Sequence, residues 1–113
     1  MNIAYTNDTS YTNNMADAKV RTPQPLQAVL SRKNIEITGA LVFEDESITY
    51  PRVDSVSVRG AQREITGGLV AYGYVPVGRW ADEGEDEDGY REWSRTFKPG
   101  EEATSAIYNF SGS

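Results

Sequence analysis

The chain has 113 residues, of which 38% are hydrophobic, and its formal net charge at pH 7 is −6. This length supports one domain with one core, and the acidic balance makes nucleic acid an unfavourable partner because phosphates carry the same charge. The sequence contains no cysteine and no histidine, which excludes disulfides, thiol and Ser-His-Asp catalysis, and zinc sites built from those residues.

Motifs for catalysis and for cofactor binding are also missing from the sequence. There is no phosphate-binding loop, dinucleotide-binding fingerprint or nucleophile elbow, so we expect neither enzymatic activity nor a cofactor. No run of 18 apolar residues occurs, and the sequence does not open with the basic and apolar segments of a secretory signal. We therefore expect no membrane partner, and a location in the cytoplasm, or in the virion if the protein is viral.

Residues 1–25 are predicted to form an extended polar arm, because they are rich in Asn, Thr and Ser and show no helical or strand periodicity. Such a segment cannot offset its own ordering entropy, so we expect a neighbouring subunit to hold it. The alternative is an arm that lies on its own domain. Tyrosine is common at interfaces, and prolines fix the bend into the domain. The expected contact residues are Tyr5, Tyr11, Pro23, Pro25 and Leu26.

Residues 26–110 are predicted to form the folded domain, followed by a flexible tail at 111–113. The run Leu26–Ser31 is expected to be a first strand, with a short helix capped by Thr22 as the alternative. A seven-residue stretch then occurs twice: Glu36–Val42 reads EITGALV, and Glu64–Val70 reads EITGGLV. Apolar residues alternate in both copies, so both are predicted to be central strands that bend at their glycines.

Further strands are predicted at four places where apolar and polar residues alternate between turn signals. They are Ile48–Tyr50, Val53–Arg59, Tyr90–Phe97 and Ala103–Phe110. Together these elements predict an all-β fold, a compact antiparallel β-sandwich or small barrel of about seven short strands with an extended N-terminal arm.

The segment Asp82–Gly89 is the one strongly charged stretch, with six acidic residues among eight. A calcium-binding loop would place Gly84 and Arg95 at positions that need carboxylates, so that pattern fails. We expect a solvated hairpin loop. The alternative is that the loop meets a basic patch on a neighbouring molecule, in which case added salt should weaken the association.

The aromatic residues of the region 72–97 have two interpretations. They can fill the core, which is the usual role of such residues. Alternatively, Trp80, Tyr90 and Trp93 can form a platform for a ligand beside the acidic loop.

Two functions are compatible with these features. The first is a non-catalytic structural protein that works in many copies, such as a capsid decoration or tail component of a virus or phage. Its partners would be further copies of itself or the subunits of a capsid or tail lattice. The alternative is a monomeric β-sandwich module that binds a glycan or a protein through residues 72–97.

Overall fold

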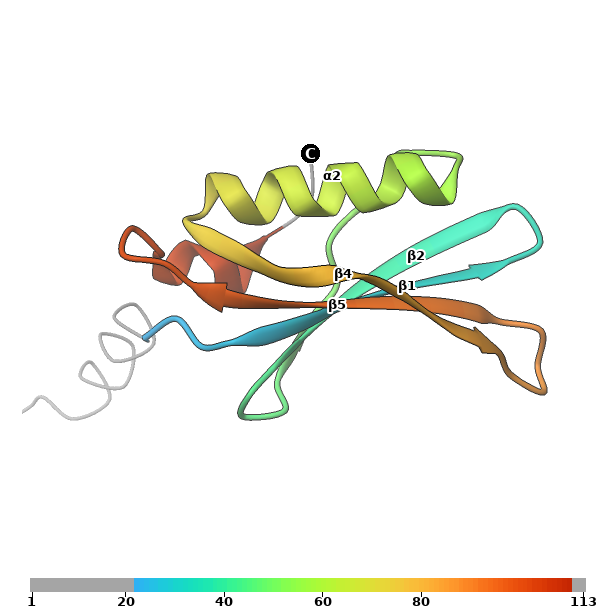
Figure 1. Cartoon of the computed structure of the whole chain (residues 1–113), viewed down its shortest axis with the longest axis horizontal. Helices are drawn as coiled ribbons and strands as arrows, with labels where there is room; N and C mark the ends of the chain where they lie inside the picture. The colour runs from blue at the N-terminus through green and yellow to red at the C-terminus, as the bar shows by residue number, and fades with distance from the viewer. Residues whose placement is uncertain (1–21, 111–113) are drawn as a thin grey trace, which may run out of the picture.

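The computed structural model describes residues 22–110, which form an antiparallel sheet with one helix across one of its faces (Figure 1). Tyr5, Tyr11, most of the predicted arm and the predicted tail at 111–113 lie outside the described residues. The elements in chain order are β1 (Leu26–Lys33), β2 (Glu36–Phe43), β3 (Ile48–Thr49), α2 (Val58–Ala71), β4 (Tyr74–Glu85), β5 (Arg91–Pro99) and the short 3₁₀-helix η1 (Ser105–Asn109).

The sheet has the strand order β3-β2-β1-β5-β4, so the first strand lies at its centre between two hairpins. Alternation along β1 places Leu26, Ala28 and Leu30 on the face that α2 covers, where all three are buried. The register sets Leu26 directly opposite Phe43 on β2 and Phe97 on β5, so three strands contribute to one apolar row.

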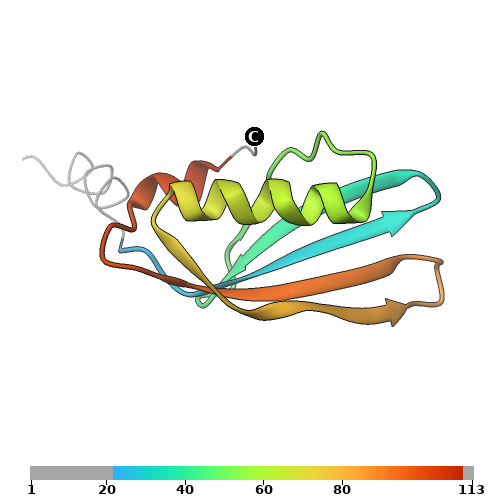
Figure 2. The same ribbon diagram turned by 45° about the horizontal axis from the view of Figure 1, so that its top comes forward.

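The helix α2 completes the core with Ala61, Ile65 and Leu69, which recur every fourth residue and are fully buried. The chain after β5 returns alongside the C-terminal end of α2, as Figure 2 shows, and η1 brings Ile107 into the same cluster. Phe110 closes this end of the core with its ring edge-on to Tyr72.

Neither α2 nor η1 lies across the opposite face of the sheet (Figure 1). On β4 the side chains of Val75 and Val77 point to this face, and each is 43% exposed. A shallow hollow of about 340 Å³ lies at one end of the sheet, and Gln27, Val42 and Thr96 of its lining share one row of the open face.

The mostly-β character predicted from the sequence is confirmed, but the elements form one open five-stranded sheet and a helix rather than a seven-stranded sandwich or barrel. The predicted strands at Leu26–Ser31, Glu36–Val42 and Tyr90–Phe97 correspond to β1, β2 and β5. The predicted strand at Ala103–Phe110 is wrong, because this segment contains η1. The predicted strand at Val53–Arg59 is also wrong, because residues 53–57 form a loop and Val58 and Arg59 begin α2.

The prediction that the second copy of the repeat is a strand is also wrong, because Glu64–Val70 lies within α2. The residues that flank Glu64–Val70 favour the helix. Ser57 caps the helix, with its side-chain oxygen accepting a hydrogen bond of 3.0 Å from the Gly60 N–H. The carboxylate of Glu64 accepts hydrogen bonds from the backbone of Asp54 and Ser55, which anchors the incoming loop.

Within the described part of the chain, no helix combines the length and the apolar composition that crossing a bilayer would require.

Candidate functional site

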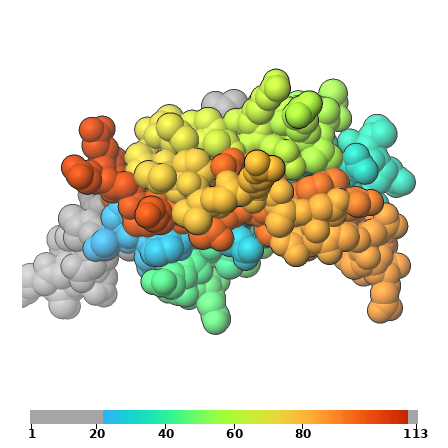
Figure 3. All heavy atoms as spheres, viewed as in Figure 1, coloured from blue at the N-terminus to red at the C-terminus, as the bar shows by residue number. Residues whose placement is uncertain are grey.

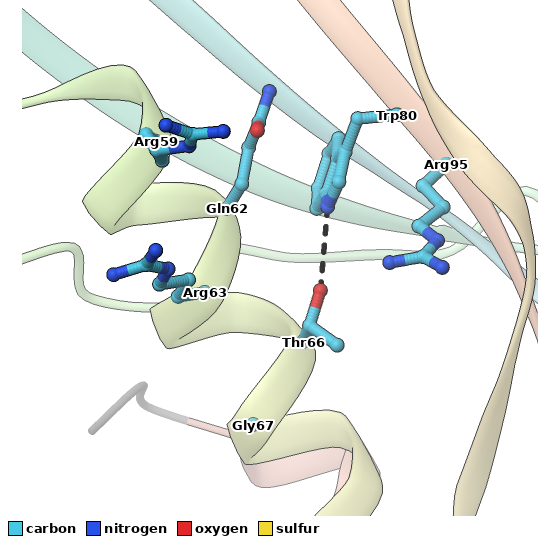
Figure 4. A pocket seen from close by; sticks show the side chains of 7 residues that line it. All are labelled: Arg59, Gln62, Arg63, Thr66, Gly67, Trp80 and Arg95. Carbon is cyan, nitrogen blue, oxygen red and sulfur yellow. Dashed lines mark hydrogen bonds between the residues drawn. The ribbon is translucent and has the colours of Figure 1, made fainter.

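A basic pocket of about 490 Å³ opens between α2 and the β4–β5 hairpin (Figure 4). We call it the arginine pocket, and its lining residues are Arg59, Gln62, Arg63, Thr66, Gly67, Trp80 and Arg95. Five of these residues belong to α2, where spacings of three and four residues place them on one side of the helix. The other two come from β4 and β5 and form the opposite wall.

Trp80 links the two walls of the pocket. Its indole Nε1–H donates a hydrogen bond of 3.3 Å to the hydroxyl oxygen of Thr66 on α2. Its ring meets that of Phe97 edge-on, with the ring centroids 6.4 Å apart. The indole is therefore held by the core on one side while it presents apolar surface to the pocket.

Arg95 is fixed in place by a bulge in β4. Its Nε and Nη2 both donate to the carbonyl oxygen of Gly78, at 3.0 and 2.6 Å. Gly78 has a φ of +68°, and the strand register shifts between Val77 and Ala81. A glycine adopts this left-handed conformation without steric cost, so the bulge turns a carbonyl toward the guanidinium. Three of the five guanidinium N–H groups are left to bind a ligand.

The electrostatics of the pocket differ from those of the whole chain. Among residues 22–110 no Asp or Glu lines the pocket, although the whole chain carries 17 acidic residues. Among the described residues, Arg59 and Arg63 make neither an ion pair nor a side-chain hydrogen bond. Like charges four residues apart on a helix repel each other, so this pair has a small energetic cost that an anionic ligand would remove.

The sequence-predicted ligand residues Trp80, Tyr90 and Trp93 are not brought together in one platform. Trp80 lines the arginine pocket, whereas the other two lie farther along the hairpin. The guanidinium carbons of Arg32 and Arg91 lie 5.4 and 6.0 Å from the centroid of the Trp93 ring. Lys33 Nζ lies 5.0 Å from the Tyr90 ring. These two rings already have cationic neighbours within the chain.

The sequence-predicted arm contacts can be located in part. Leu26 is buried in the core of its own domain, whereas Pro25 is exposed beside the shallow hollow on the open face of the sheet. Pro23 is half-buried. For Tyr5 and Tyr11 the contacts fall outside the described residues.

The acidic stretch is divided between the end of β4 and the turn that follows it. Asp82 pairs with Arg91 at 2.6 Å, and the hydrogen bond from this guanidinium, helped by one from the Gly84 N–H, lowers the pKa of Asp82. The side chain of Asp86 accepts hydrogen bonds of 2.9 Å from the backbone N–H groups of Asp88 and Tyr90. The carboxylate of Glu83 accepts a hydrogen bond from the Ser94 hydroxyl on β5, so three of the six acidic residues stabilise the hairpin itself.

The remaining carboxylates at the tip of the hairpin are Glu85, Glu87 and Asp88. All three residues are exposed, and their carboxylates have no ion pair or hydrogen bond within residues 22–110. No group of three or more acidic side chains in this part of the chain is arranged to hold a metal ion.

Sequence reasoning missed the arginine pocket because it assigned Glu64–Val70 to a strand. In a strand Arg59 and Arg63 would lie far apart, whereas in a helix they are neighbours. The sequence feature that indicates the helix is the spacing of four residues between Ala61, Ile65 and Leu69, which follow the capping residue Ser57.

Comparisons of this chain with protein families, with curated proteins and with solved structures found no match.

Proposed function

We propose that this chain is a non-catalytic binding domain that captures an anionic group of a partner in the arginine pocket. The observation that carries the proposal is the approach of three arginines to one tryptophan-lined pocket that no carboxylate of the described part of the chain lines. Guanidinium groups bind carboxylates and phosphates through paired N–H donors, and they do so most strongly where a ligand excludes water. Trp80 supplies an apolar wall that can exclude water on one side.

The lining favours binding over catalysis. General-base catalysis needs a side chain whose pKa lies near the working pH, and the pocket offers only guanidinium, amide, hydroxyl and indole groups. The Thr66 hydroxyl is the one candidate nucleophile, and its oxygen already accepts a hydrogen bond from Trp80. No lining residue can take its proton, so hydroxyl attack on a bound ligand has no support.

The role expected first from the sequence, an assembly protein of a virus or phage particle, stays a prediction. It is compatible with the proposal, because an assembly contact can also place an acidic group in the arginine pocket. A glycan-binding role has less support, since the described aromatic rings do not form a continuous platform.

An NMR titration of the indole N–H resonances tests the proposal directly. Tetraglutamate serves as the carboxylate probe, and inorganic pyrophosphate serves as the phosphate probe. Either probe should shift the Trp80 indole signal, while the Trp93 signal, which belongs to a residue outside the pocket, should stay in place. The substitution Arg63→Gln should weaken binding about tenfold, as expected for the loss of a charge-assisted hydrogen bond.

Arg79→Gln is the matched control, because it removes the same charge from an exposed residue that does not line the pocket. Equal weakening by the two substitutions would show that only net charge matters. Failure of both probes to move the Trp80 signal would reject the proposed function.

A further inference from the structure

We propose that the occupant of the arginine pocket is the acidic hairpin tip of a second copy of this chain, so that copies join head to tail. We define the hairpin tip as Glu85–Tyr90. This inference rests on the proposed function, because it names the partner that delivers the anionic group.

The first support is complementary charge between two surfaces of the same chain. Glu87 and Asp88 are exposed, and their carboxylates make no ion pair or hydrogen bond with another described residue, while the exposed Glu85 lies opposite Arg91 in the ladder. Arg59 and Arg63 on α2 are exposed cations that make no ion pair or side-chain hydrogen bond with another described residue. A contact between copies would pair both sets at once. Complementary charges of this kind also steer the approach of two molecules.

The second support is that hydrogen bonds hold the hairpin tip in one conformation before it docks. The turn is closed by backbone hydrogen bonds from Asp86 N to Tyr90 O, at 2.9 Å, and from Gly89 N to Asp86 O, at 3.1 Å. The Asp86 side chain adds its two bonds to the same turn, and Asp82–Arg91 braces the strands behind it. A rigid segment loses little entropy on docking. Figures 1 and 3 show the β4–β5 hairpin projecting beyond the helix at one end of the molecule.

The third support is that one chain cannot satisfy this contact by itself. The tip and one wall of the pocket belong to the same β4–β5 ladder, with Glu85 paired to Arg91 at one end and Val77 paired to Thr96 near the pocket. A paired ladder cannot fold back on itself, so the tip must enter another molecule. A contact between two different surfaces produces rings or open chains of subunits rather than twofold dimers.

The test is a complementation experiment with two charge-reversed variants of the full chain. The pocket variant is Arg59→Glu with Arg63→Glu, and the tip variant is Glu87→Lys with Asp88→Lys. The wild-type chain should form species larger than a monomer at about 50 mM NaCl, and these should dissociate at about 500 mM NaCl because salt screens the contact. Each variant alone should be monomeric, since each has lost one half of the contact.

A mixture of the two variants gives the decisive result. The intact tip of the pocket variant can enter the intact pocket of the tip variant, and the reversed tip and reversed pocket are again opposite in charge, so species larger than a monomer should reappear and should contain both variants. Analytical ultracentrifugation measures the masses. The matched controls reverse the same number of charges elsewhere, and they should assemble as the wild type does. They are Glu101→Lys with Glu102→Lys, and Arg79→Glu with Lys98→Glu.

The other outcomes separate this inference from the proposed function. A wild-type chain that stays monomeric at low salt while its Trp80 signal still responds to tetraglutamate would reject self-assembly and keep the binding role. Association that persists in both variants, or that strengthens with salt, would place the contact elsewhere, such as on the open face of the sheet. If a reversed variant loses its folded circular-dichroism spectrum, the neutral pairs Arg59→Gln with Arg63→Gln and Glu87→Gln with Asp88→Asn replace it. Each neutral variant alone should be monomeric, and their mixture should stop at one heterodimer, because a neutral tip and a neutral pocket do not attract each other.

Discussion

Two adjacent glycines in α2 have opposite surroundings. A Cβ built on Gly67 meets nothing within 4 Å, whereas a Cβ on Gly68 would lie 2.4 Å from Cζ of Phe110. Phe110 is buried and packs edge-on against Tyr72, so its ring cannot move aside without opening the core. The first glycine is therefore optional for the fold, and the second is required by the close approach of a buried ring.

These surroundings predict opposite effects for one substitution at neighbouring positions. Gly67→Ala should stabilise the protein by roughly 0.5–1 kcal/mol, because alanine loses less backbone entropy in a helix. Gly68→Ala should destabilise it by about 1–3 kcal/mol through overpacking. Urea unfolding of the two variants beside the wild type measures both free energies. Two changes of the same sign would show that Phe110 does not confine Gly68.

At the level of elements, the chain folds nearly the same seven residues in two ways. Glu36–Val42 lies in β2, where it pairs with β1, and Glu64–Val70 lies in α2. Local propensity is a weak influence beside tertiary context. The first copy follows a tight hairpin turn with Asn34 at a φ of +58°, whereas the second follows a capped helix start. The flanking residues therefore determine the secondary structure of each copy.

This dependence on flanking residues predicts a measurable role for the cap of α2. Ser57→Ala should lower the free energy of unfolding by about 1 kcal/mol, because the Gly60 N–H loses its acceptor. Ser57→Thr is the matched control, since threonine retains the capping oxygen and should cost much less. Chemical denaturation followed by circular dichroism measures the difference. Equal losses in the two variants would mean that the hydroxyl is not the stabilising group.

The parts of the fold that sequence patterns could predict are those built from period-two alternation. β1, β2 and β5 were predictable because their apolar faces alternate and turn signals lie between them. The arginine pocket was not, since Arg59 and Arg63 become neighbours only once their segment is helical. Trp80 was singled out as an aromatic residue, but its position in the pocket depends on the bulge near Gly78.

At the level of the whole molecule, Tyr74 connects the edge strand β4 to the segment that precedes the central strand β1. It lies at the start of β4 with 2% of its surface exposed, and its hydroxyl donates a 2.7 Å hydrogen bond to the carbonyl oxygen of Gln24. That carbonyl precedes β1, so the bond ties the entry of the chain to the edge strand. Burial, reinforced by the nearby Tyr108, raises the pKa of Tyr74 to about 12.

The raised pKa predicts that the folded state loses stability in alkaline solution. In the unfolded chain the phenol loses its proton near its ordinary pKa of about 10, while the folded state holds the proton until about pH 12. The unfolded state therefore gains from deprotonation first, and the free energy of unfolding should fall between those values by up to about 2–3 kcal/mol. Urea unfolding across this range measures the fall.

Tyr74→Phe should be less stable at neutral pH, because the hydrogen bond to Gln24 is lost, yet its free energy of unfolding should depend less on pH. Tyr50→Phe, at a residue that is 74% exposed, should keep the wild-type slope. If Tyr74→Phe follows the wild-type slope as well, the buried phenol is not what links alkaline pH to unfolding.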